Sequence, residues 1–590
     1  MQLITLDFET YFDSEYTLKK ETVESYVRDP RFKVHCVGIK EGNETYMMRD
    51  PAMLGVNKWP VQHEQAVLCH NAQFDGLILS HHYNTKPAFW FDTLSMARLV
   101  LPHLKSHSLE ALAAHFGLAA KTVPYEEFKG VKDLPPDLYN KLAEGCAHDV
   151  NLTHAIFLKL LPSVPPEELR VIDATIRMFT EPVLELDKPR MEAYLAGEQE
   201  KKSNALRALG VSKADLQSSA KFAGMLGRLG VACPTKPSPS DPGKQIFAFS
   251  KNDEGMKELL NHENETVAAL AAARIGEKST LGETRAKRLI EMAGRGALCV
   301  YLTYCGAHTT RWSGGDSLNW QNFTRGSEIR KSIMAPAGHQ LVIIDLAQIE
   351  CRMLNWLAGQ EDILEAFRAG RDVYCDAATR ALGRRITKSD KLERQLFKTA
   401  ELGLGYGMGH IKFDSVLKQQ GLEGDANQLV RFYRSTHPQV VKLWHTADRI
   451  LATLEVGYHA EGGYFWGPME LKGKKIVLPN GAALDYSHLR IEGGEYVTEG
   501  RRGAAKMYGA KLVENVVQAL SRLVLSQAMV KIAVWRRVLL TVHDELVIYC
   551  KTEDAQDCLA ECLQIMKTPP EWAKDLPLDA EGIISERYSK

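Results

Sequence analysis

The sequence predicts an α+β protein of several domains. Its 590 residues are enough for roughly three or four domains. Short apolar runs such as residues 341–344 predict buried strands, whereas long apolar-periodic stretches such as 510–532 predict helices. The proline-containing stretch 161–166 predicts a linker, and therefore a domain boundary.

The composition is that of an ordinary globular protein, with 45% hydrophobic and 25% charged residues. No run of 18 apolar residues occurs, so we expect no membrane span, and the N-terminus enters a predicted strand without a signal peptide. The 11 cysteines lack CxxC spacing, which favours a reducing cytoplasm over a zinc site or a disulfide framework. The net charge of −1 does not by itself indicate a nucleic-acid binder, although residues 271–340 hold ten Lys or Arg against five Asp or Glu.

Acidic residues recur at predicted strand and helix positions in the first 150 residues. Asp7 and Glu9 alternate along the predicted strand 4–10, so both side chains face the same side. Asp75 follows a second predicted strand, and Asp149 lies on a predicted helix. Two carboxylates on one face of a strand are costly unless they are solvated or bind a metal.

Two further acids end predicted strands in the second half of the chain. The strand 341–344 runs into Asp345, and residues 538–549 predict a β-hairpin with His543 and Asp544 at its connection. Read alone, Asp345 is equally consistent with a strand that only reaches the surface. Two strand ends that each offer an Asp can hold two cations for phosphoryl or nucleotidyl transfer.

A third stretch supplies groups that would bind the substrate of such a site. Arg394, Lys398, Leu402 and Tyr406 are spaced by four, which predicts one face of a helix. Two cations followed by an apolar and an aromatic residue suit a triphosphate and its sugar or base. The alternative is an amphipathic helix with solvated charges. The glycines between positions 403 and 409 argue against it, because glycine weakens a helix unless something approaches closely.

These three stretches resemble motifs A, B and C of the family A DNA polymerases, the bacterial DNA polymerase I group and its bacteriophage relatives. Residues 345–352 match DxxQIExR, and residues 394–407 match RxxxKxxx(F/Y)GxxYG. The one departure is Leu402, where the family usually has Phe or Tyr. Residues 543–545 match HDE. Residues 309–313 and 318–322 are similar to blocks with which the family reads the primer–template.

The resemblance implies a template-dependent DNA polymerase in which Asp345 and Asp544 bind two Mg²⁺ ions, with Mn²⁺ as a substitute. Arg394 and Lys398 would hold the β- and γ-phosphates, and Lys398 would protonate the leaving pyrophosphate. Glu350 would lie near the sugar and crowd a 2′-hydroxyl. The implied nucleotide-binding residues are Arg394, Lys398, Leu402, Tyr406, Glu350 and Gln348. The implied DNA-binding residues are Arg311, Asn319, Gln321, Asn322, Gln518 and His543.

The N-terminal acids resemble those of the DEDD-type 3′→5′ exonucleases, which have a ribonuclease H-like fold. The resemblance makes Asp7, Glu9, Asp75 and Asp149 the catalytic metal ligands. The third block of the family is usually YxxxD, but the position four before Asp149 is Gly145. A related subgroup has His five before the Asp, where this chain has Glu144, while His148 is adjacent to it. A degenerate domain kept as a scaffold is the alternative.

The resemblance also implies the domain order of a right-hand polymerase behind an exonuclease. The predicted domains are the exonuclease (1–165), the thumb and connecting helices (166–300), the first part of the palm (301–360), the fingers (361–462) and the second part of the palm (463–590). The expected partners are primer–template DNA, dNTPs and replication helper proteins. We expect a monomer without a membrane contact, acting in the host cytoplasm in bacteriophage replication.

Two rival functions fit part of the pattern. A single-subunit RNA polymerase has a related palm, but the exonuclease acids and Glu350 argue against it. A nucleic-acid-binding scaffold with a decayed catalytic centre is the other rival. The intact Asp345, Asp544, Arg394 and Lys398 argue against that scaffold.

Overall fold

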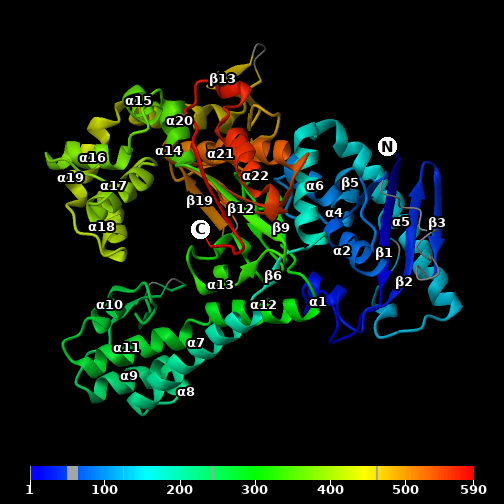
Figure 1. The fold of residues 1–590 in the computed structure, drawn as a ribbon, viewed down its shortest axis with the longest axis horizontal. Coiled ribbons are helices and arrows are strands. Elements are labelled where there is room, and N and C mark those ends of the chain that lie inside the picture. The colour runs from blue at the N-terminus through cyan, green and yellow to red at the C-terminus, as the bar shows by residue number, and fades with distance from the viewer. Residues whose placement is uncertain are drawn as a thin grey trace. The chain divides into compact units, whose positions relative to one another are not determined.

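The chain forms two compact units in the computed structural model. The first unit comprises Met1–Val183, Cys299–Asn322 and Ala335–Glu586, and the second comprises Leu184–Leu298, Phe323–Met334 and Arg587–Lys590. Within these limits the structure describes residues 2–49, 64–121, 123, 125–238, 240–241, 243–459, 463–500 and 503–589. Helices and several separate sheets alternate along the chain (Figure 1), so the predicted α+β class is confirmed.

A five-stranded mixed sheet forms the N-terminal part of the first unit, in the order β3-β2-β1-β4-β5. Its strands are β1 (Leu3–Thr10), β2 (Val34–Glu41), β3 (Glu44–Met48), β4 (Ala66–Cys69) and β5 (Phe89–Asp92). The first three pair antiparallel, whereas β1, β4 and β5 pair parallel. Helix α5 (Pro136–Leu160) packs against β1 and β2.

A four-stranded antiparallel sheet lies at the centre of the same unit, in the order β20-β21-β12-β22. The strands are β12 (His339–Leu346), β20 (Arg537–Val542), β21 (Glu545–Lys551) and β22 (Ala580–Ser585). Residues 341–344 are all fully buried, as the apolar run predicts. Helix α22 (Ala555–Lys567) packs against β12 and β22.

Helices follow β12 up to residue 456, as predicted for this region. They are α14 (Ile349–Ala358), α15 (Glu361–Arg368), α16 (Val373–Leu382), α17 (Lys391–Leu404), α18 (His410–Gln419), α19 (Ala426–Thr436) and α20 (Pro438–Val456). Short antiparallel strands come next, in a sheet β13–β16 between Tyr464 and Asp485 and a sheet β17–β19 between Arg490 and Met507. The predicted boundary at residue 462 lies outside the described residues.

The second unit is mainly helical. Its helices are α7 (Lys188–Leu209), α8 (Lys213–Gln217), α9 (Ser219–Arg228), α10 (Glu254–Leu260), α11 (Glu265–Lys278), α12 (Leu281–Arg295) and α13 (Glu328–Lys331). The sequence predicts a thumb from residue 166, but helix α6 (Pro166–Thr180) belongs to the first unit, because it packs against α2 (Ala72–Tyr83) and β5. The predicted domains divide the chain by expected function, whereas the two units are defined by compactness. The predicted limits therefore stay predictions.

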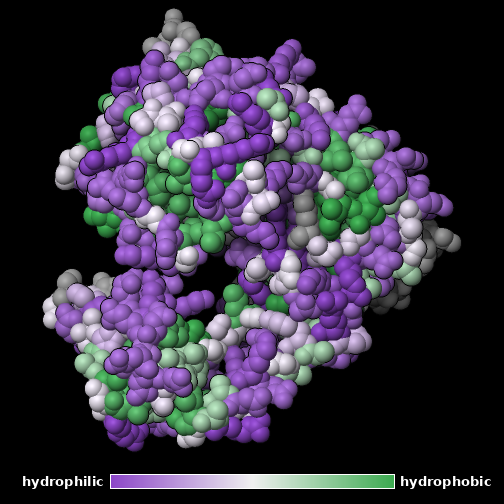
Figure 2. Space-filling view, turned by 60° about the vertical axis from the view of Figure 1, so that its left-hand side comes forward, coloured by the Kyte–Doolittle hydropathy of each residue, from purple (hydrophilic) through white to green (hydrophobic). Residues whose placement is uncertain are grey.

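One helix, α21 (Gly509–Ala533), is long and apolar enough by composition to cross a membrane. Within its most apolar window, 72% is buried inside the protein, which is typical of a core helix. The face drawn in Figure 2 is largely hydrophilic, with hydrophobic patches between the polar areas.

A buried ion pair joins α6 to α21. The Arg522 guanidinium donates to both carboxylate oxygens of Glu168, and both residues are buried. Asn480 Nδ2 donates to Glu168 Oε1 at 2.8 Å, and the Tyr304 hydroxyl donates to Oε2. The carboxylate therefore has partners from three other segments of the first unit.

Truncating this carboxylate should strongly destabilise the protein. In Glu168→Ala the Arg522 charge stays buried without its partner, so we expect a loss of about 3–5 kcal/mol, measured by urea unfolding. Glu361→Ala removes one of the two exposed carboxylate partners of Arg368 and should cost less than about 1 kcal/mol. Equal losses of unfolding free energy in the two variants would contradict this interpretation.

Candidate active sites

Strand pairing brings Asp345 and Asp544 together at the same end of the central sheet. Asp345 lies opposite Glu545 in the register of β12 and β21, and Leu346 N–H donates to the Asp544 carbonyl at 3.0 Å. Both aspartates are half-buried. Glu581 on β22 lies opposite Asp345 on the other side. Neither Glu545 nor Glu581 is among the site residues predicted from the sequence.

The tight turn that carries Asp544 is held by a glutamine. Val542 pairs with Glu545, which leaves His543 and Asp544 as the connection, and His543 has a left-handed φ of 52°. Such a backbone is uncommon for a residue other than glycine. Gln321 Oε1 accepts from His543 N–H at 3.0 Å, and its Nε2 donates to the Thr541 carbonyl at 2.5 Å. Both polar ends of the buried Gln321 amide thus hold the hairpin, and its DNA contact stays a prediction.

Glu350 links two of the other predicted site residues. Its carboxylate accepts from the Arg311 guanidinium and, at 3.3 Å, from the Tyr406 hydroxyl. All three side chains are half-buried. Burial, together with the neighbouring Glu350 charge, holds the pKa of Tyr406 well above its usual value, so the phenol stays protonated and can donate. The structure therefore joins motif A, motif B and the 309–313 block through one carboxylate.

Helix α17 presents Arg394, Lys398 and Leu402 on its solvent side, as the spacing predicts. Phe397, Ala400 and Leu404 are buried on the opposite side, whereas Leu402 is 41% exposed. Arg394 Nε donates to Asp372 at 2.8 Å. Among the residues that the structure describes, the Lys398 ammonium group has no hydrogen-bond or ion-pair partner.

Tyr406 is not on this helix, which corrects the prediction. Helix α17 ends at Leu404, and Gly407 has a left-handed φ of 75°. A Cβ at Gly407 would lie 2.7 Å from the Cβ of Ala510, and one at Gly405 would lie 2.7 Å from Leu354. The chain turns off the helix here because only glycines fit against α21 and α14, and the turn brings Tyr406 to Glu350.

The remaining predicted residues lie on separate elements of the first unit. Gln518 on α21 is half-buried and donates to Glu514 at 3.3 Å. Asn319 Oδ1 accepts from Gln321 N–H at 3.0 Å, and Asn322 is exposed. Gln348 has a left-handed φ of 56° directly before α14. Their contacts with DNA or nucleotide stay predictions.

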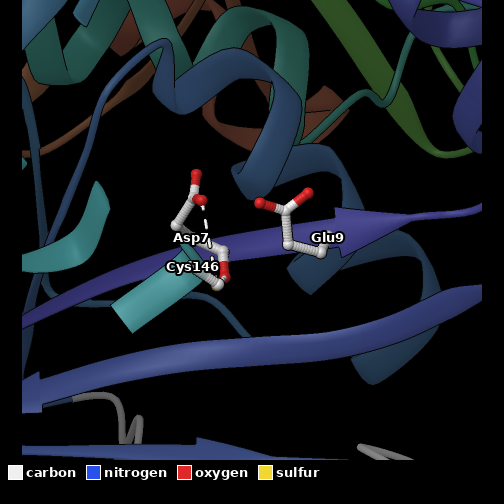
Figure 3. A group of neighbouring side chains, drawn as sticks. All are labelled: Asp7, Glu9 and Cys146. Carbon is white, nitrogen blue, oxygen red and sulfur yellow. Dashed lines mark hydrogen bonds between the residues drawn. The ribbon is translucent and has the colours of Figure 1, made fainter. Parts of the chain in front are cut away.

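The four N-terminal acids converge from three elements. Asp7 and Glu9 extend from the same side of β1 (Figure 3), and their carboxylate oxygens lie within 4.8 Å of each other and of the Cys146 sulfur. Asp75, on α2, accepts from Phe8 N–H at 3.1 Å. Asp149 is buried on α5. The structure thus brings together all four residues that the sequence singles out.

Two residues that the sequence analysis did not single out complete this cluster. The Tyr125 hydroxyl lies 2.9 Å from Glu9 Oε1 and 3.1 Å from Asp149 Oδ2. Lys121 Nζ forms an ion pair with Asp149 Oδ2 at 2.5 Å. Lys121 lies outside regular secondary structure and Tyr125 begins the short helix η2 (Tyr125–Phe128), and neither belongs to a periodic pattern or motif.

Burial of the acids changes their protonation. Burial and the charge of Asp149 raise the pKa of Asp7 to about 7, opposed by Lys121. Burial and the charge of Asp7 hold the pKa values of Glu9 and Asp75 well above the usual range. A bound cation would stabilise the charged form of these carboxylates and so lower their raised pKa values.

The stability of the cation-free protein should depend on pH through Asp7. The folded state binds this proton more tightly than the unfolded state, so stability falls as pH rises from about 4 to 7. Asp7→Asn removes the ionisation. In EDTA, we expect the unfolding free energy of this variant to rise relative to that of wild type by about 1–3 kcal/mol between pH 5 and pH 8, measured by thermal unfolding. Asp137→Asn, on an exposed position, should follow wild type, and a pH-independent difference for Asp7→Asn would refute the assignment.

Comparison with known proteins finds similarity to DNA polymerases. Residues 190–456 match the family model "DNA polymerase family A". A DNA polymerase of Bacillus phage SP02 is 24% identical, and the match covers all of both chains. DNA polymerase I of Pseudomonas aeruginosa is 25% identical over 85% of this chain, and thermostable DNA polymerase I of Thermus thermophilus is 28% identical over 45%. The matched regions cover 54% and 28% of those two bacterial proteins.

A solved structure has the same fold. The POL domain of Pol1 from M. smegmatis, in complex with a DNA primer–template and dNTP, matches with a TM-score of 0.68 and 15% identity. The match covers 99% of this chain and 95% of that one, so the predicted polymerase fold is confirmed. Residues 190–456 thus resemble the DNA polymerase family A in sequence, and the chain shares the fold of a polymerase domain.

Proposed function

We propose that this chain is a template-dependent DNA polymerase that adds deoxynucleotides to a primer 3′ end and proofreads with a 3′→5′ exonuclease. The observation that carries the polymerase proposal is the pairing of β12 with β21, which sets Asp345 beside Asp544. The family match and the relatives named above support it.

The donor set beside the central sheet fits divalent cations. Asp345 and Asp544 offer carboxylate oxygens, which Mg²⁺ prefers, and they lie at neighbouring strand ends. Two bound Mg²⁺ or Mn²⁺ ions would activate the primer 3′-hydroxyl and stabilise the pyrophosphate leaving group. The role of Asp345 and Asp544 is to hold those ions over the primer end.

The exposed face of α17 is the proposed triphosphate contact. Arg394 and Lys398 bring two positive charges one turn apart, and Lys398 has no ion-pair partner among the described residues. We propose that both bind the β- and γ-phosphates and that Lys398 protonates the departing pyrophosphate. Glu350, fixed by Arg311 and Tyr406, would stand near the sugar and exclude a 2′-hydroxyl.

The N-terminal acid cluster is the proposed exonuclease site. Asp7, Glu9, Asp75 and Asp149 converge, and the raised pKa values of Asp7, Glu9 and Asp75 fit a site that takes divalent cations. Such cations would activate water against the terminal phosphodiester. The convergence favours an active nuclease over a scaffold.

Primer–template DNA and dNTPs are the proposed partners, as in the complex of the M. smegmatis domain. The full-length match to a phage DNA polymerase supports a role in bacteriophage DNA replication. A primer-extension assay with dNTPs or rNTPs separates this proposal from the RNA polymerase alternative.

Two variants should separate the proposed activities. Asp544→Asn should lower primer extension by on the order of 10³-fold or more and leave primer degradation intact, because it removes one cation ligand of the polymerase site only. Asp149→Ala should do the reverse. Asp557→Asn, on the exposed side of α22, should keep both rates. Full extension by Asp544→Asn would exclude the proposed two-cation site.

Leu402 should set the tolerance of chain terminators. A tyrosine at this exposed position would place a hydroxyl beside the proposed sugar contact. That hydroxyl can donate a hydrogen bond in place of the 3′-hydroxyl that a dideoxynucleotide lacks. We expect Leu402→Tyr to raise the ratio of dideoxynucleotide to deoxynucleotide incorporation by roughly tenfold, about one hydrogen bond. Leu402→Met keeps an apolar side chain and should keep the wild-type ratio. An unchanged ratio in Leu402→Tyr would disprove the contact.

A further inference from the structure

Val123 covers the face of α5 on which the position four before Asp149 lies. That position is Gly145, and a Cβ built there would lie 2.5 Å from Val123 Cγ2 and 3.0 Å from Val123 Cβ. No side chain fits without moving Val123. The glycine is therefore a packing requirement, and it lets the chain before α5 lie directly over the helix.

The same segment delivers Tyr125 to the acids. Tyr125 begins the short helix η2 (Tyr125–Phe128), and Phe128 is buried in a core cluster with Cys36, Leu142 and Cys146. This anchor fixes the tyrosine ring, whose hydroxyl lies within 3.1 Å of carboxylate oxygens from β1 and α5. Lys121 Nζ lies 5.2 Å from the centre of the same ring.

The hydroxyl can serve two groups at once. A phenol has one proton to donate and lone pairs to accept with. Glu9 and Asp149 come from different elements, and the single proton between them is donated to one carboxylate at a time or shared by both, which holds the two oxygens around the hydroxyl. The oxygen keeps acceptor capacity for a water molecule at the same place.

We propose that Tyr125 is a positioning residue of the exonuclease and supplies, from the segment before α5, the hydroxyl that the family resemblance assigns to the position of Gly145. The inference rests on the proposed exonuclease function. In this arrangement Tyr125 holds Glu9 and Asp149 in place and orients the water that attacks the terminal phosphodiester. Gly145 makes room for the segment that carries it.

The test measures degradation of a single-stranded oligonucleotide with Mg²⁺, by steady-state kinetics. Tyr125→Phe keeps the ring and removes the hydroxyl, so kcat should fall by on the order of 10- to 100-fold while KM for the oligonucleotide changes less than about twofold. Tyr139→Phe, on α5 and in contact with the same cluster, is the matched control and should keep wild-type kcat. Primer extension by each variant reports that the chain is folded.

A second pair of variants tests the packing half of the inference. Gly145→Ala should lower kcat like Tyr125→Phe, because the new methyl group displaces Val123 and with it Tyr125. Adding Val123→Ala removes the nearer of the clashing atoms and should restore part of the rate. The same addition in Tyr125→Phe should restore nothing.

The outcomes distinguish the inference from the function beneath it. Wild-type protein that degrades no primer would overturn both. An active wild type that Asp149→Ala silences, together with wild-type kcat in Tyr125→Phe, would overturn the role of Tyr125 alone. Equal losses in Tyr125→Phe and Tyr139→Phe would also overturn it, because they would indicate a general loss of packing.

Discussion

The antiparallel ladder between β12 and β21 is the interaction on which the proposed polymerase site depends. It joins segments about 200 residues apart in the chain, and its register sets Asp345 opposite Glu545 at the end where the hairpin turns. A slip of one residue would turn Asp345 to the other face of the sheet. Burial of residues 341–344 on both faces opposes any such slip, because the slip would move polar Gln340 or Asp345 into a fully buried position.

Residues from other segments fix the turn and the side chains that surround this ladder. Gln321 holds the turn from both sides, which offsets the unfavourable backbone of His543. Glu350 connects Arg311 and Tyr406 to the start of α14. Gly405 and Gly407 end α17 where it meets α14 and α21. The site residues are thus held by side-chain hydrogen bonds and close packing between distant parts of the sequence.

The N-terminal cluster presents the opposite physical situation. Its backbone places four acids together, and burial then disfavours their charges. Lys121, Tyr125 and the Phe8 amide each compensate part of that cost by hydrogen bonding or charge. A site built this way gains most when a cation enters, which fits the proposed nuclease chemistry.

Local sequence patterns predict the parts of this account that depend on local structure. The alternation of Asp7 and Glu9, the apolar run before Asp345 and the four-residue spacing of Arg394, Lys398 and Leu402 each reflect one strand or helix, and each lies as predicted. The end of α17 and the role of Gln321 depend on neighbours far along the chain. The position of Tyr125 also depends on a residue outside its own stretch, because the missing side chain of Gly145 leaves the space that Val123 occupies.

The most direct test of the central claim is the anomalous scattering of Mn²⁺ in crystals of the chain with a primer–template and a non-hydrolysable dNTP. The account predicts two peaks about 3.5–4 Å apart, both within coordination distance of carboxylate oxygens of Asp345 and Asp544. Bound nucleotide without a Mn²⁺ peak at either aspartate would contradict it.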